Sequence, residues 1–281
     1  MDKPRPGVAS RAYRATFHLA APAEAVWKAL TDARELARWF PPSARVEPGE
    51  GGQVELDWPG FFTWPMRVDA WEPDQRLLLT YPSGTHGPAG QEAVRLAVEF
   101  QLEGHGGETT LRIVHSGFGP DAQWDAELDG VSRGWAAELA NLAHYLQHHR
   151  GHDRHIAWVW QEVPDCLRAW AQVAGEAGLA SPGLATLRTG EPYAITTALG
   201  DRFSGRVIVS DPRGDFAGTA SEWNDGTFRV WADLCGGKHS VWIFLSTWGV
   251  DPARVEAFRA EWQAKLAMML APAGNAQGVT K

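Results

Sequence analysis

Histidines are the side chains of this sequence best suited to chemistry near neutral pH, and one of them ends a strand-like segment. A strand over 109–115 would place the imidazole of His115 at the mouth of a pocket, just before Ser116, Gly117 and Phe118. There it could donate a hydrogen bond to a ligand or move a proton. Since the sequence identifies no acid or nucleophile beside it, a structural hydrogen bond is the simpler interpretation.

A second group of histidines follows at positions 144, 148, 149, 152 and 155. His144 and His148 are one helical turn apart and could bind a single metal ion. No carboxylate or cysteine completes a familiar ligand pattern, and Gly151 should end the helix within the group. We therefore expect a solvated helix end and a linker here, and no metal site.

Other catalytic signatures are missing from the sequence. It contains no Gly-x-Ser-x-Gly elbow, no Gly-x4-Gly-Lys-Ser/Thr phosphate loop, no His-Glu-x2-His and no Cys-x2-Cys. An enzyme would have to rely on pocket residues that belong to no motif. The sequence therefore predicts no catalytic residue and no cofactor, and it favours a role other than catalysis while leaving enzymatic activity open.

Aromatic and apolar side chains provide the leading candidate site. The chain has fifteen tryptophans and only four tyrosines, which indicates either cores built from large rings or a pocket lined with them. A long helix lying across a sheet would enclose such a pocket, although each of these side chains could simply fill a core. The candidate ligand-binding residues are Trp39, Phe40, Trp58, Trp64, Met66, Leu79, Phe100, His115, Phe118, Trp124, Leu128 and Trp135.

A strand and two short helices must close one end of this pocket. The extended lead-in from Phe17 is followed by Pro22 and Glu24, which are typical of a helix start, and by apolar residues over 25–30. A second amphipathic turn over 33–40 ends at Pro41 and Pro42. Together these segments predict a lid-like unit.

Alternating strands and one long helix complete the first half. From Asp121, apolar residues recur every three or four positions up to Leu146, which predicts a long amphipathic helix. Six strands joined by short turns precede it, so an antiparallel meander is the natural topology. The first half is thus predicted to be one α+β domain over 10–150. The expected strands are 44–47, 53–58, 62–71, 76–81, 93–102 and 109–115.

The second half repeats this order in weaker form over 154–271. A strand at 155–160 and a helix over 164–173 lead to five strands and a closing helix over 252–270. The spacing Trp262-x3-Leu266-x2-Met269 repeats that of Trp135, Leu139 and Leu142, which indicates an internal duplication. Residues 178–191 would stand where the first copy has its second short helix, and 272–281 are expected to be a disordered tail. The five strands are expected at 193–199, 203–209, 216–223, 227–233 and 239–247, with a hairpin signal at Asp225-Gly226.

Composition limits the partners and the compartment. A net charge of −8 with scattered Lys and Arg argues against nucleic acid as a partner. No run approaches the roughly 20 apolar residues of a membrane span, and the N-terminus lacks the apolar segment of a secretory signal. With only Cys166 and Cys235, a reducing compartment is the default. We expect a soluble cytoplasmic protein.

Four spaced motifs carry a resemblance to a known family. They are the residues 21–32, the Leu36-x2-Trp39-Phe40 turn, the residues 115–118, and the helical pattern from Gly134 to Leu146. In this order they resemble the START-like (SRPBCC) superfamily, and within it bacterial proteins related to the C-terminal domain of the activator of the ninety-kilodalton heat-shock-protein ATPase. The resemblance covers residues 10–149, and the second half resembles a degenerate copy.

This resemblance implies a helix-grip fold, in which a curved antiparallel sheet wraps around a long C-terminal helix and two short helices close the cavity. Members of the superfamily include lipid and hormone carriers, cyclases and co-chaperones, so the fold does not decide the function. We expect the first half to bind a hydrophobic or aromatic small molecule. The alternatives are a co-chaperone-like module acting on a heat-shock ATPase and a cyclase or hydrolase acting in the pocket. A homodimer is also left open.

Overall fold

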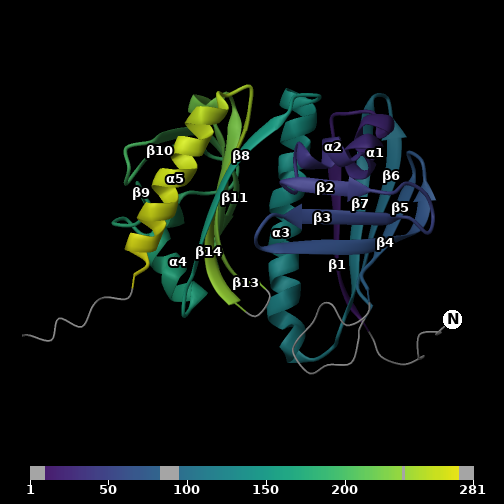
Figure 1. Ribbon diagram of the computed structural model, residues 1–281, viewed down its shortest axis with the longest axis horizontal. Helices are drawn as coiled ribbons and strands as arrows, with labels where there is room; N and C mark the ends of the chain where they lie inside the picture. The colour runs from purple at the N-terminus through teal and green to yellow at the C-terminus, as the bar shows by residue number, and fades with distance from the viewer. Residues whose placement is uncertain (1–9, 83–94, 236–237, 272–281) are drawn as a thin grey trace, which may run out of the picture. The chain divides into compact units, whose positions relative to one another are not determined.

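The computed structural model describes residues 10–82, 95–235 and 238–271 of the chain. The chain divides into two compact units between Arg154 and His155. Figure 1 shows that each unit contains one sheet and one long helix. The predicted tail at 272–281 and the beginning of the strand predicted over 93–102 lie outside the described residues.

Seven antiparallel strands form the sheet of the first unit, in the order β1-β7-β6-β5-β4-β3-β2. Strands that follow one another from β2 to β7 are neighbours, and β1 pairs with β7 at the far edge. The meander predicted from the turn spacing is therefore present. The strands are β1 (Arg11–Leu19), β2 (Ser43–Val46), β3 (Gln53–Trp58), β4 (Phe62–Glu72), β5 (Arg76–Thr80), β6 (Ala97–His105) and β7 (Glu108–Phe118).

Three helices lie against this sheet (Figure 1). α1 (Ala23–Thr31) begins after Pro22, and α2 (Ala33–Ala37) begins after Asp32, whose side chain caps it. α3 (Asp125–His144) is the long helix, preceded by a short 3-10 turn and followed by a π-helical turn over Tyr145–His149. The sequence predicted a single helix here and missed both changes of pitch.

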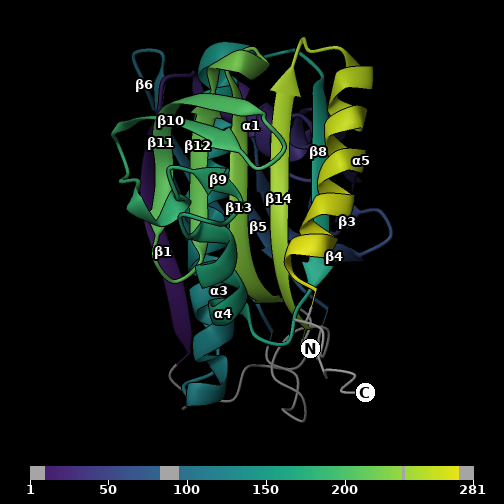
Figure 2. The same cartoon turned by 90° about the vertical axis from the view of Figure 1, so that its left-hand side faces the viewer.

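The second unit also contains a sheet of seven antiparallel strands, in the order β8-β14-β13-β12-β11-β10-β9. One short helix, α4 (Cys166–Ala174), follows its first strand, and a long helix, α5 (Pro252–Met269), ends it. Figure 2 shows these two helices in front of the sheet. The strands are β8 (Arg154–Glu162), β9 (Ala180–Ser181), β10 (Pro192–Thr197), β11 (Arg202–Asp211), β12 (Asp215–Ala220), β13 (Gly226–Cys235) and β14 (Lys238–Trp248).

The two sheets have the same strand order when each strand is counted from the start of its unit. Each unit begins with an edge strand that pairs with its last strand and ends with a long helix. This common topology confirms the predicted fold class, an α+β helix-grip fold that is duplicated. None of the described helices is long and apolar enough to cross a membrane.

The second copy differs from the first where the second lid helix would be. The segment that follows α4 contains the two-residue strand β9 and a 3-10 turn over Leu184–Thr186, so no α-helix stands within 178–191 in the place of α2. The strand predicted over 216–223 ends at Ala220, because a 3-10 turn and two left-handed residues, Asn224 and Asp225, form the connection to β13.

Aromatic rings fill the core of the second unit. Phe203 of β11 stacks on Phe228 of β13 with ring centroids 4.2 Å apart, and both side chains are fully buried. Phe258 of α5 meets Phe203 and Trp223 edge-on, at 6.1 and 5.4 Å. Trp262 continues this cluster along α5. The helix is thus seated on the sheet by interlocking rings, which favours a filled core over an open cavity.

Candidate functional site

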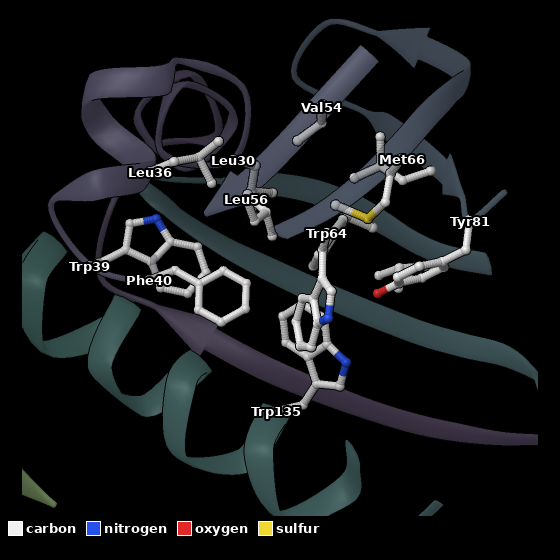
Figure 3. A pocket seen from close by; sticks show the side chains of 13 residues that line it. Leu30, Leu36, Trp39, Phe40, Val54, Leu56, Trp64, Met66, Tyr81 and Trp135 are labelled. Carbon is white, nitrogen blue, oxygen red and sulfur yellow. The ribbon is translucent and has the colours of Figure 1, made fainter. Parts of the chain in front are cut away.

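An apolar cavity lies in the first unit between the sheet, the two short helices and α3 (Figure 3). Trp135 projects from α3 towards Trp64 of β4, with Phe40 on one side and Tyr81 on the other. Every lining side chain is aliphatic or aromatic. The cavity is lined by Leu30, Leu36, Trp39, Phe40, Val54, Leu56, Trp64, Met66, Leu79, Tyr81, Val98, Phe100 and Trp135.

Strand alternation and helix periodicity bring these side chains together. On β3, Val54 and Leu56 point inwards because side chains of a strand alternate between the two faces. Leu36 of α2 and Phe40 just beyond it are four residues apart, so one turn of the lid, residues 33–41, presents both to the cavity. Trp64 is the half-buried member of the lining, whereas Met66 is buried.

The cavity is narrow in this conformation. The space open to the centre of a water molecule is about 20 Å³, which corresponds to about one water. Aromatic contacts account for this closeness: Phe40 lies 5.5 Å from Trp135 between ring centroids, and Phe100 meets Trp135 edge-on at 5.6 Å. A drug-sized ligand would therefore require the lining to move apart.

The indole N–H groups of two tryptophans in the cavity wall form hydrogen bonds within the protein. The indole Nε1 of Trp39 donates to the carbonyl oxygen of Ala29 at 2.8 Å, and that of Trp135 donates to Nδ1 of His115 at 3.1 Å. Burial raises the pKa of the Tyr81 phenol, which therefore stays protonated. The wall consequently offers apolar surface and no charge.

Seven of the twelve predicted ligand-binding residues line this cavity. They come from the lid, from β4, β5 and β6, and from α3, which are the elements that the sequence pattern predicted as its walls. Whether they bind a ligand remains a prediction. The seven are Trp39, Phe40, Trp64, Met66, Leu79, Phe100 and Trp135.

The other five predicted residues lie outside the lining. Trp58 ends β3 and packs against Phe62 and Trp64 at ring distances of 4.6 and 5.0 Å. Phe118 and Trp124 are fully buried, with ring centroids 6.0 Å apart, next to the start of α3. Leu128, in the first turn of α3, is half-buried.

His115 lies one layer behind the cavity wall. It is buried and parallel to the ring of Tyr81 at 5.7 Å, while its Nδ1 accepts the hydrogen bond from Trp135. That bond requires Nδ1 to carry no proton, so the imidazole is the neutral tautomer with its proton on Nε2. The structural hydrogen bond preferred from the sequence is therefore present.

Six lining residues were not among the predicted ones, and only some had a signal in the sequence. Val54, Leu56 and Val98 have the same strand parity as predicted neighbours, so alternation could have identified them. Tyr81 follows β5, and Leu30 and Leu36 depend on how deeply the two short helices are seated, which a sequence pattern does not specify.

The histidines near the end of α3 form a cluster of rings. The ring centroids of His144 and His148 are 4.8 Å apart, and those of His144 and His149 are 5.2 Å apart. His144 and His149 are buried, and His148 is exposed. The one-turn spacing anticipated from the sequence thus brings two imidazoles together at the edge of the π-helical turn.

The sequence of the first unit matches a family model. Residues 20–147 match the family described as Activator of Hsp90 ATPase homolog 1-like protein. No curated protein matches the chain.

Solved structures with similar folds include a Mesorhizobium loti protein, 24% identical, which pairs 50% of this chain with 98% of its own at a TM-score of 0.44. The Aha1 dimer from Colwellia psychrerythraea is 20% identical and pairs 50% with 99% at 0.41. DynU16, a protein in the dynemicin biosynthetic locus, is 18% identical and pairs 92% with 96% at 0.41.

The family match agrees with the motifs and with the observed topology. It covers β2 to β7, both short helices and all of α3, and therefore every element that lines the cavity. Such a domain is of a ligand-binding or co-chaperone-like kind. Residues 20–147 of the first unit therefore fit a START-like domain similar to the Activator of Hsp90 ATPase homolog 1-like proteins.

Proposed function

We propose that the first unit binds an uncharged hydrophobic or aromatic small molecule between its sheet, its two short helices and α3. The observation that carries this proposal is the uncharged, mainly apolar lining, formed by thirteen side chains from seven separate elements or their ends. Removing apolar ligand surface from water there would supply on the order of 25 cal/mol per Å².

The narrow cavity makes a definite demand on binding. A space that accommodates about one water does not accept an aromatic molecule unless the lid or the β3–β4 side moves outward. Trp64 is half-buried, and it packs on Trp58 and Phe62 at 5.0 Å each, so a ring stack borders the cavity on that side. We therefore expect binding to be slower than diffusion, since opening must come first.

The test uses N-phenyl-1-naphthylamine, a neutral aromatic probe whose emission rises in apolar surroundings. Titration into the full chain should give saturable fluorescence. Val54→Phe should weaken binding about tenfold or more, because the added ring occupies the cavity and the packed side chains around it cannot easily move away.

Met268→Phe is the matched control, because Met268 is 75% exposed on α5 and far from the lining in sequence. It should leave the dissociation constant of the probe unchanged. Absence of saturable binding to the unaltered chain, or equal binding by Val54→Phe and the unaltered chain, would refute the proposal.

A co-chaperone-like role is the second candidate, and the family match favours it. In that case the first unit would act through its surface on a heat-shock ATPase. Steady-state ATP hydrolysis by a purified Hsp90 from a bacterium should then rise on addition of the full chain. Val54→Phe should stimulate as well as the unaltered chain, because the cavity plays no part in a surface contact.

A further inference from the structure

The lid of the first unit, defined here as residues 33–41, is held by charged groups from the end of that unit. Asp153 accepts from both arginines of the lid: Arg34 Nη2 at 2.7 Å and Arg38 Nη2 at 2.8 Å. A second hydrogen bond from each Nε, at 3.2 and 3.0 Å, makes both contacts two-pronged. One carboxylate thus connects two successive turns of the lid.

The side chain of Arg154 binds the backbone at the end of the same lid. Its Nη2 donates to the carbonyl oxygens of Phe40 and Pro41, at 3.1 and 2.7 Å. Carbonyls at the end of a helical segment lack partners within it, so an external donor stabilises this conformation. Phe40 lines the cavity, and the contact therefore acts directly on a wall residue.

A different set of contacts ties the lid to α3 and the π-helical turn. Arg38 Nη1 donates to Glu35 Oε1 at 2.5 Å, and the hydroxyl of Tyr145 donates to Glu35 Oε2 at 2.5 Å. Asn141 Nδ2 donates to the carbonyl oxygen of Trp39 at 2.5 Å. These groups are buried, so separating them would leave polar atoms unsatisfied away from water.

The contacts of Asp153 can break more easily. The side chain of Asp153 is 55% exposed, and that of Arg34 is 71% exposed, so water can replace each hydrogen bond. Arg38 keeps its ion pair with Glu35 when Asp153 leaves. The lid is thus fixed by a permanent buried anchor and by an outer contact that can open.

We infer that Asp153 and Arg154 form a latch on the lid, so that the segment joining the two units controls access to the cavity. This inference rests on the proposed binding function. Residue 154 is also the first residue of β8, the strand that begins the second sheet. Ordering or displacing that strand would therefore change the hydrogen bonds of Arg154 to the lid. A change in the second unit would reach the lid through the covalent chain.

The test compares Asp153→Asn and Arg154→Met with the unaltered full chain by two measurements. Amide hydrogen exchange of residues 33–41 should accelerate about two- to fivefold for Asp153→Asn, the range that exposed ion pairs support. It should accelerate about tenfold for Arg154→Met, because a charged donor to two carbonyls is lost. The association rate of N-phenyl-1-naphthylamine should rise by the same factors.

Asp129→Asn is the matched control, since it removes the same charge from an ion pair with Arg133 on α3. It should change neither measurement. Unaltered exchange in both latch variants would overturn the latch, and faster exchange with an unchanged association rate would overturn its control of access. If the unaltered chain does not bind the probe, the proposed function fails, and the exchange rates alone decide whether the latch exists.

Discussion

Trp135 connects the cavity to the buried histidine behind it. Its ring lies in the cavity wall, and its Nε1 donates to Nδ1 of His115, which is 4% exposed. Trp135→Phe keeps an aromatic ring but removes the donor. We expect the free energy of unfolding to fall by about 1–3 kcal/mol, the usual penalty when a buried acceptor loses its partner.

Urea unfolding of the full chain measures this effect, and Trp71→Phe is the control. Trp71 is a half-buried tryptophan of β4 in the same unit, in edge-on contact with Trp27 at 5.2 Å. An equal decrease in both variants would show that the ring size, and not the hydrogen bond to His115, determines the loss.

The pKa of Asp153 sets the lowest pH at which its part of the latch holds. Hydrogen bonds from Arg34 and Arg38 lower its pKa from 3.8 to about 2, while Glu35 and Tyr145 lie on the far side of Arg38. A lowered folded-state pKa means that the ionised carboxylate stabilises the fold above pH 4, and that this stabilisation disappears as the pH falls towards 2.

The difference in unfolding midpoint between the unaltered chain and Asp153→Asn should therefore be constant above pH 4 and shrink towards pH 2. Comparing the two proteins cancels the titration of the other carboxylates. A difference that stays the same from pH 5 to pH 2 would contradict this assignment.

Among the elements, α2 depends most on groups outside itself. It has five residues, too few to form a stable helix alone. Asp32 caps it by accepting from the backbone N–H groups of Arg34 and Glu35 at 3.0 and 2.9 Å. Asp32→Ala should reduce stability by about 0.5–2 kcal/mol and accelerate hydrogen exchange in 33–41.

Asp165→Ala provides the matched comparison, because Asp165 caps α4 by accepting from the N–H of Arg168 at 2.7 Å. It removes the same kind of cap from the second unit. Exchange in the lid should respond to the first variant only, and a response to both would mean that capping acts through global unfolding.

The elements were the part of the molecule that the sequence predicted best. Proline and apolar spacing locate α1, and alternation locates β3, because these patterns follow from the geometry of a single segment. These patterns do not predict how close a residue lies to the cavity. Trp58 has the parity of Val54 but lies at the far end of β3, where it packs on the lining residues Phe40 and Trp64 without lining the cavity itself.

The latch shows why other contacts could not be predicted from the sequence. Arg34 and Asp153 are separated by 119 positions, and nothing in either segment specifies the other. The cluster of histidines nearby attracted attention because one-turn spacing is visible in a sequence. A carboxylate that closes a network across the fold has no local signature, and only the folded chain reveals it.

At the scale of the whole molecule, duplication has given two units with one topology and different interiors. Tryptophans are distributed accordingly. In the first unit Trp39, Trp64 and Trp135 surround the cavity. In the second, Trp231 and Trp242 stack at 5.6 Å on the sheet face opposite Val241 and Ile243, which belong to the core. The tryptophans therefore serve in a pocket wall in the first unit and, in the second unit, in a row across a sheet as well as in the core, where Trp223 and Trp262 lie.

This difference predicts that the full chain binds one apolar ligand and not two. Val54 of β3 and Ile195 of β10 occupy the third strand of their respective units, and both are buried. In the second unit, the stacked rings of Phe203 and Phe228 already occupy the space under the helix. Isothermal titration with N-phenyl-1-naphthylamine should give one site per chain.

Ile195→Phe and Val54→Phe separate the two interiors. Each adds a ring to a packed position and should destabilise its own unit by about 1–3 kcal/mol. Only Val54→Phe should weaken probe binding, because the cavity wall includes Val54, whereas Ile195 belongs to the ring-filled core. Two sites per chain, or loss of binding in Ile195→Phe at a temperature where the chain stays folded, would place a working cavity in the second unit. One site that only Val54→Phe removes would mean that the duplicated unit has exchanged a ligand cavity for a packed core.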